Sequence, residues 1–183
     1  MENLIEKIQS NVDLKNIYNK MLDYLSKRNY SEKKLIQKII DLKKYYPYSQ
    51  RYQNYTRENA KIAMALVKEY GFLNENQYAR NLLDYLINKK DGLRRIRQKM
   101  LNRLIKKEIV EKTINEFQKK SKQDLTRIIE LTKLKREQLQ KKYKGDWKKT
   151  AQINNKLYLF IQQKGYTNDE TKEILNFNFK EIA

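Results

Sequence analysis

Residues Val67 to Arg103 read VKEYGFLNENQYARNLLDYLINKKDGLRRIRQKMLNR, and this stretch decides the fold. Three helical patterns meet in it, with a glycine at each joint. Gly71 follows the first pattern, where a left-handed backbone after a helix C-terminus favours glycine. Asn74, with Gln77 three residues later, predicts a capping box that opens the next helix. Gly92 precedes the third pattern, so the stretch contains one complete helix between two joints.

The third pattern predicts a helix with one apolar side and one cationic side. Leu93, Ile96, Met100 and Leu104 fall at helical spacing and should pack. The expected partner-binding surface consists of the nearby cations, which are Lys89, Lys90, Arg94, Arg95, Arg97, Lys99 and Arg103. Guanidinium groups bind carboxylates and phosphates with paired hydrogen bonds, so an acidic protein patch and a DNA backbone both suit this surface. The alternative is a solvated helix face, but arginines concentrate here in a chain that otherwise prefers lysine.

The net charge is the strongest signal in the composition. The 183 residues include 41 Lys and Arg against 22 Asp and Glu, a formal charge of +19. Such an excess repels itself unless a polyanion or an acidic protein surface is nearby. Nucleic acid, an acidic protein or a complex of both are therefore the natural partners. Part of the lysine content could instead reflect an AT-rich genome.

The same composition excludes several classes of protein. The chain has no Cys and no His, which excludes disulfide scaffolds, zinc fingers and nucleophiles activated by histidine. Four scattered glycines build no phosphate loop, and the acidic residues lack metal-ligand spacing. We expect no enzymatic activity, no cofactor and no metal. Without a signal peptide or an apolar run of about 18 residues, we expect a cytoplasmic protein with no membrane contact.

Hydrophobic periodicity predicts an all-α fold of nine helices and no strand. The helices are expected at about 14–28, 31–44, 56–70, 74–90, 93–103, 107–119, 125–143, 146–164 and 167–177. The helicity of residues 1–13 is left open. Ser31, Leu35, Lys38 and Ile39 match Gly92, Ile96, Lys99 and Met100 in a shared frame. The chain therefore divides into a lead-in (1–13) and three tandem three-helix repeats (14–72, 73–120 and 121–183) that form an elongated molecule.

Three further segments carry separate expectations. The Tyr45–Tyr55 loop could stack on bases or fill an interface pocket, or its tyrosines could cover a neighbouring helix. The long helix after the cap expected at Asp124 is basic on several sides, so it either follows a phosphate track or is solvated. Trp147, beside a helix start, is expected in the core.

The central segment resembles RecX, the bacterial regulatory protein of the recombinase RecA. The resemblance rests on EYGFLNE at Glu69–Glu75, on Tyr78-Ala79 and on LRRIRQ at Leu93–Gln98. Tyr30-Ser31 and Lys164-Gly165-Tyr166-Thr167 resemble the family's second helix start and its C-terminal end. The match covers about residues 14–177. One departure is Leu104, which follows Arg103 where the family often has Lys-Gly.

The resemblance implies a curved molecule of three tandem three-helix repeats that binds the RecA filament, and we expect the protein to be a monomer. Through that filament it would meet single-stranded DNA, with direct DNA contact as a possibility. It also implies a regulator that limits strand exchange, ATP hydrolysis and RecA-stimulated repressor cleavage, the SOS coprotease activity. Two hypotheses compete with this one: a stand-alone basic helical DNA-binding protein, and a structural helical array without a charged partner.

Overall fold

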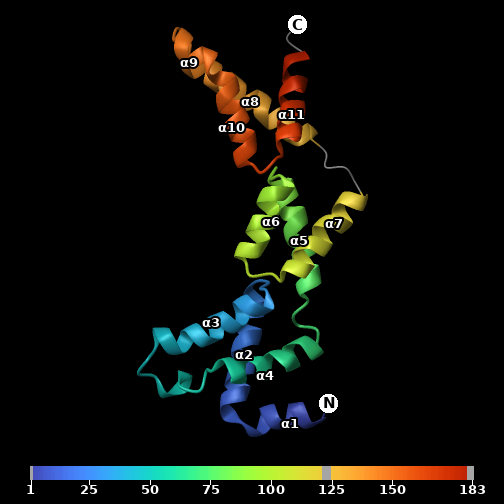
Figure 1. Ribbon diagram of the computed structural model, residues 1–183. Coiled ribbons are helices and arrows are strands. Elements are labelled where there is room, and N and C mark those ends of the chain that lie inside the picture. Colours follow the sequence, from blue (N-terminus) through green and yellow to red (C-terminus); the bar gives the residue numbers. More distant parts are fainter. Residues whose placement is uncertain (1, 121–124, 181–183) are drawn as a thin grey trace. The chain divides into compact units, whose positions relative to one another are not determined.

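The computed structural model describes residues 2–120 and 125–180, and this part of the chain is helical without strands. The helices of its first half are α1 (Glu2–Ser10), α2 (Val12–Lys27), α3 (Glu32–Tyr45), the 3-10 helix η1 (Gln50–Tyr52), α4 (Arg57–Glu69) and α5 (Glu75–Asn88). Those of its second half are α6 (Leu93–Asn102), α7 (Lys107–Lys120), α8 (Thr126–Lys142), α9 (Trp147–Ala151), α10 (Ile153–Gln163) and α11 (Asn168–Lys180) (Figure 1). The all-α prediction is confirmed. The expected cap Asp124 lies outside the described residues.

Residue contacts divide the chain into two compact units. Unit 1 comprises the residues up to Asn81 together with Met100–Val110. Unit 2 comprises Leu82–Lys99 together with the residues from Glu111 onward. Each unit contains its own buried apolar cluster, so each is described by itself.

Unit 1 is built around the packing of α2 against α3 and α4 (Figure 1). Its core gathers the apolar stripes of these three helices, including Ile17 and Met21, Leu35 and Ile39, and Val67. The lead-in, whose helicity the sequence left open, forms α1. Ile8 of α1 is buried with Leu14 and Leu66, which explains why this short segment is helical against α2 and α4.

The Tyr45–Tyr55 loop has two sides. Tyr55 is almost completely buried, and Tyr52 packs against the same core with its ring edge-to-face on Tyr55. Tyr45 and Tyr46 are exposed, and Tyr48 is 98% exposed. The later tyrosines therefore cover helices, as one of the alternatives expects, whereas the earlier ones face solvent and stacking on bases stays a prediction for them.

Unit 2 buries residues of α8, α10 and α11, which lie together in Figure 1. Ile128, Ile161, Tyr166 and Ile174 form one buried cluster. Leu139, Ile153 and Leu157 form a second.

The segment that follows α8 corrects two expectations. The helix expected from residue 146 is divided, because α9 ends at Ala151 and α10 begins at Ile153. The expectation that Trp147 belongs to the core is wrong, since the side chain is 75% exposed. The five-residue α9 has no buried residue, so it offers no core against which the indole could pack. The prediction assumed one continuous helix from residue 146, and its apolar spacing is interrupted at Gln152, between α9 and α10.

None of the helices in the described ranges has both the length and the apolar character that crossing a membrane requires.

Candidate partner-binding face

The start of α6 is fixed by a backbone-to-backbone contact in unit 2. The Gly92 N–H donates to the Lys164 carbonyl over 2.8 Å, and the Gly92 carbonyl accepts the Ile96 N–H. A Cβ on Gly92 would lie 2.5 Å from the carbonyl carbon of Gly165. Gly165 itself has a φ of +92°, and a Cβ there would lie 2.4 Å from the Cβ of Arg95. Glycine is required at Gly92 for close approach, and at Gly165 for close approach and for its left-handed backbone.

Asp91 is the buried acid of this face. It is 2% exposed, and it is paired with two cations of α6. The Lys99 ammonium contacts its Oδ2, and the Arg95 Nε lies 3.5 Å from its Oδ1. Arg95 also donates to the Gln163 carbonyl over 2.8 Å. Two residues of the expected cation row thus point at an acid and a carbonyl within the unit, so that part of the row is not a free surface.

A surplus of positive charge nevertheless remains around Asp91. Burial lowers the pKa of the Lys164 ammonium below its ordinary value, and the positive charges of Arg95, Lys99 and Lys90 lower it further, against the opposing effect of Asp91. Four cations therefore share the field of one carboxylate. Such an arrangement favours an additional anion, because each positive charge raises the energy of the others.

The remaining cations of the face differ in how free they are. The Arg97 guanidinium forms a bidentate salt bridge with the Glu111 carboxylate, and both N–O distances are 3.0 Å. Arg94 is exposed, and no carboxylate of the described residues pairs with it. Lys89 is exposed with its ammonium over the Tyr85 ring. Lys90 has a left-handed backbone (φ 62°), and its carbonyl accepts the Tyr166 hydroxyl at 3.5 Å. Arg94 and Lys89 are thus the cations most available to a partner.

Arg103 and Leu104 belong to a corresponding joint in unit 1. The Ser31 hydroxyl, which also caps α3, donates to the Arg103 carbonyl over 2.7 Å. The exposed Arg103 side chain reaches the Tyr78 hydroxyl at 3.5 Å. Leu104 takes the left-handed conformation (φ 59°), and the Ile105 N–H donates a hydrogen bond to the Met100 carbonyl. Leucine therefore occupies a position that favours glycine.

The two joints share a contact pattern, although a side-chain hydroxyl donates in one and a backbone N–H in the other. The residue before α3, Ser31, bonds to the carbonyl that precedes left-handed Leu104, and the residue before α6, Gly92, bonds to the carbonyl that precedes left-handed Gly165. The frame that matched Ser31 with Gly92 in the sequence thus matches them in structure.

An acid beside the unit 1 joint is paired with two lysines. The Glu32 carboxylate lies 2.9 Å from the Lys106 ammonium and 3.3 Å from that of Lys68. Burial acts to raise the pKa of Glu32, but the hydrogen bonds from Lys106 and Lys68 outweigh it, so the pKa lies below its ordinary value.

Sequence reasoning missed three residues of the α6 face, namely Asp91, Glu111 and Lys164. The spacing of Asp91, Arg95 and Lys99 at intervals of four was a readable signal for ion pairing along a helix. Glu111 and Lys164 are distant in sequence, so no local pattern indicated them.

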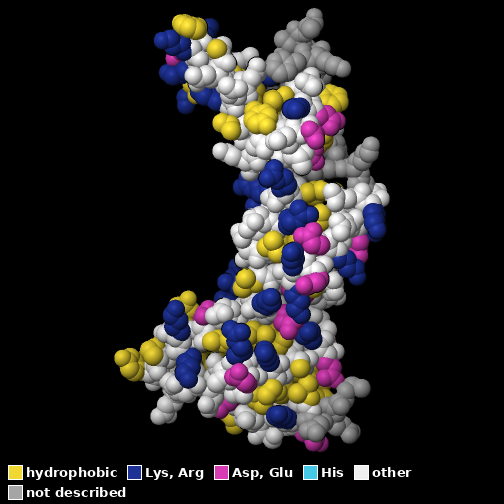
Figure 2. All heavy atoms as spheres, in the orientation of Figure 1, with side chains coloured by type: hydrophobic (Ala, Val, Ile, Leu, Met, Phe, Trp, Pro, Cys, Tyr) yellow, Lys and Arg dark blue, Asp and Glu magenta, His cyan; other side chains and the backbone are white. Residues whose placement is uncertain are grey.

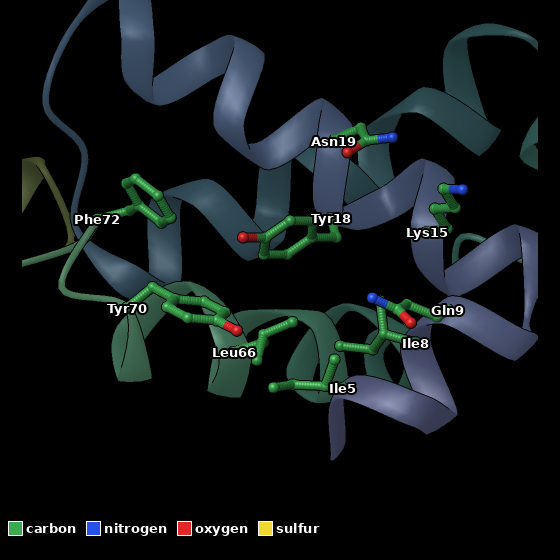
Figure 3. Close-up of a pocket in the computed structure, with 9 residues that line it drawn as sticks. All are labelled: Ile5, Ile8, Gln9, Lys15, Tyr18, Asn19, Leu66, Tyr70 and Phe72. Carbon is green, nitrogen blue, oxygen red and sulfur yellow. The ribbon is translucent and has the colours of Figure 1, made fainter. Parts of the chain in front are cut away.

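A separate pocket lies in unit 1 between α1, α2 and α4. Its volume is about 340 Å³, and Figure 3 shows Tyr18, Tyr70 and Phe72 around it with the apolar side chains of α1. Lys15 is the single charged residue among the lining residues, and most of the others are apolar or aromatic.

Comparisons with known proteins confirm the resemblance indicated by the central segment, although no family model matches the chain. Two curated proteins named Regulatory protein RecX, from Clostridium botulinum strains Alaska E43 and Eklund 17B, are each 28% identical to it. The first match covers 131 residues, 69% of this chain, and the second covers 129 residues, 68% of it. The chain spans 58% of the length of each of these relatives.

Solved structures show a shared fold. The crystal structure of RecX from Lactobacillus salivarius superposes with a TM-score of 0.61 and 19% identity, covering 90% of this chain and 95% of that one. A crystal structure of a regulatory protein RecX superposes with a TM-score of 0.63 and 17% identity, covering 96% of this chain and 78% of that one.

Proposed function

We propose that this chain is a regulator of the recombinase RecA that binds the RecA–single-stranded DNA filament as a monomer. It limits the recombinase, ATPase and SOS coprotease activities of RecA and has no catalysis of its own. The observation that carries this proposal is its similarity to proteins named Regulatory protein RecX over more than two thirds of the chain. The joint that occurs in both units supports the further proposal that residues 14–72, 73–120 and 121–183 are three-helix repeats.

The charge distribution is the physical support for such a partner. Four cations around Asp91 share one carboxylate, and Arg94 and Lys89 face solvent beside them. A filament of protein on DNA presents carboxylates and phosphates together, and both neutralise this surplus. Because Arg95, Arg97 and Lys99 are already paired, they hold the face in shape, while the exposed Arg94 and Lys89 make the first contact.

The test is DNA-dependent ATP hydrolysis by RecA while this protein is titrated far below the RecA concentration, with competitor DNA in excess. A filament regulator inhibits at such ratios, because one bound molecule affects many subunits. Inhibition that requires enough protein to saturate the DNA would support the stand-alone DNA-binding protein instead. No effect on hydrolysis at any ratio would reject the proposal and leave a helical array without a charged partner.

Charge reversal tests the face itself. Arg94→Glu with Lys89→Glu should raise the inhibitory concentration about tenfold or more, since like charges would then meet the acidic partner. The matched control is Lys33→Glu with Lys61→Glu, two exposed lysines of unit 1, which should inhibit like the parent protein. Equal inhibition by both variants would remove the α6 face from the proposal. Arg97 is unsuitable for this test because its reversal would set a second carboxylate against Glu111.

A further inference from the structure

The turn between α8 and α9 carries the largest exposed aromatic ring of unit 2 in a cluster of lysines. Trp147, the only tryptophan of the chain, is 75% exposed. Residues 141–149, called here the tryptophan tip, contain five lysines, one acid and no arginine: Lys141, Lys142, Lys144, Lys148, Lys149 and Asp146. Figure 2 shows Lys and Arg side chains, coloured alike, gathered with hydrophobic side chains at the α9 end of this unit.

Hydrogen bonds order the tip, so the exposure of Trp147 is a property of the fold. The Asp146 N–H donates to the Tyr143 carbonyl over 2.9 Å, and the Asp146 carboxylate caps α9 by accepting the Lys149 N–H. The Thr150 hydroxyl donates to the Asp146 carbonyl, and Gly145 makes the turn with a φ of +85°. A braced turn that holds an indole in water gives up the burial that a large aromatic ring normally gains.

The lysines of the tip are mostly unmatched by acids. Asp146 pairs with Lys149 at 2.9 Å, which uses its charge locally. Lys141, Lys142, Lys144 and Lys148 are exposed, and no carboxylate of the described ranges pairs with them. The Lys148 ammonium lies 5.7 Å from the centre of the Trp147 ring. The tip thus combines an exposed indole ring with four lysines that no carboxylate of the described residues pairs with.

We propose that the tryptophan tip is a direct binding site for single-stranded nucleic acid. An indole face stacks on an unpaired base, and surrounding cations hold the phosphates on each side. The lysine ammonium groups of the tip can hold phosphates as point charges, without the bidentate geometry with which Arg97 holds Glu111. A base paired in a duplex does not offer its face, so the site prefers single strands. This inference goes beyond the proposed function, because it requires no RecA.

Trp147 reports on its own site, since no other indole is present. Selective excitation of the indole, while an oligothymidylate is titrated into the full chain without RecA, should show quenching that saturates. Trp147→Ala should raise the Kd about tenfold, as expected for one lost stacked base, and Trp147→Phe should recover part of the loss. Affinity of the variants is measured with a labelled oligonucleotide. Because α9 has no buried residue, these variants should keep the parent helicity and unfolding midpoint.

Salt dependence tests the lysines separately. Lys144→Gln with Lys148→Gln should reduce the slope of log K against log salt by about 1.4, since each phosphate contact on a single strand contributes about 0.7. Lys33→Gln with Lys61→Gln removes the same charge from unit 1 and should leave the slope unchanged.

Three outcomes would overturn the inference. One is indole fluorescence that does not respond to a bound oligonucleotide. Another is equal affinity of the parent protein for oligothymidylate and for an abasic strand of the same length, together with no loss of affinity in Trp147→Ala, which would indicate charge alone. The last is quenching by RecA without DNA and none by the oligonucleotide, which would assign the tip to an acidic protein surface. Since the oligothymidylate titration is made without RecA, its failure leaves the ATPase result untouched.

Discussion

Leu104 is a residue at which sequence and backbone disagree. Its φ of 59° lies in the left-handed region, and its side chain is 39% exposed. Gly71 and Gly165 hold the same kind of position with φ values of +72° and +92°. A residue with a Cβ costs ~1–2 kcal/mol in this conformation, and Leu104 is too exposed for burial to offset that cost in full.

Replacement of Leu104 by glycine should therefore stabilise unit 1. Glycine gives the unfolded chain more conformational freedom, which lowers stability by ~0.5–1 kcal/mol. Because relief of the backbone strain is larger, we expect a net stabilisation of ~0.5 kcal/mol. Chemical denaturation measures it. Leu104→Ala is the control, because it keeps the strain and loses the side chain. A loss of stability in Leu104→Gly would show that packing of the leucine matters more than its backbone.

Single residues also show what a sequence can and cannot predict. The cap at Asn74 is confirmed, since its side chain accepts the Gln77 N–H over 2.9 Å. Gln77 does not return the bond, because its amide reaches Asn81 instead. The left-handed Gly71 is also confirmed. Gly92 was correctly placed at a joint, but its cause is the approach of Gly165, which no local pattern contains.

At the scale of elements, the joint of α3 with the segment after α6 depends on pH through Glu32. The pKa of Glu32 is lower in the folded than in the unfolded chain, so its pair with Lys106 and Lys68 stabilises above the ordinary value of 4.5. This contribution is lost as the pH falls through the folded pKa. The lysines are 40% and 46% exposed, so solvent screening limits the effect.

Glu32→Gln should cost ~1 kcal/mol at neutral pH, and the difference from the parent should shrink as the pH falls below 4.5. Urea denaturation at several pH values measures both parts of this prediction. Glu130→Gln, which removes an exposed acid of α8, should change stability little at any pH. A cost of Glu32→Gln that stays constant with pH would assign the effect to packing rather than to the carboxylate.

For whole helices too, local sequence predicts the helix and its buried side, but not the distant residues that its side chains contact. Apolar spacing predicted α6 and the side that packs, and Ile96 and Met100 are fully buried. The cationic side was predicted as an open row, but Arg95 and Lys99 turn to Asp91, and Arg97 turns to Glu111. Helical periodicity gives the direction of a side chain, whereas its partner depends on how distant segments fold back.

For the whole molecule, the excess of positive charge affects stability more than any single ion pair does. If each of the 22 acids neutralised one cation, 19 of the 41 Lys and Arg would remain unmatched. The cations around Asp91 and those of the tryptophan tip are two places where this excess is concentrated. The folded chain without a partner therefore contains net repulsion, which dissolved salt screens.

The thermal unfolding midpoint should consequently rise as sodium chloride is increased from low to moderate concentration. Screening also weakens native ion pairs, but exposed pairs contribute little to stability. Relief of the repulsion among the unmatched cations should therefore be the larger effect. A rise of roughly 2–4 °C would correspond to ~1 kcal/mol of relieved repulsion. Lys144→Gln with Lys148→Gln lowers the net charge, so the midpoint of this variant should rise less with salt. A saturating polyanion at low salt should raise the midpoint of the parent by most of the amount that salt does. A midpoint that falls with salt would mean that pairs such as those of Asp91 and Glu32 outweigh the repulsion, and the need for an anionic partner would then lose its physical basis.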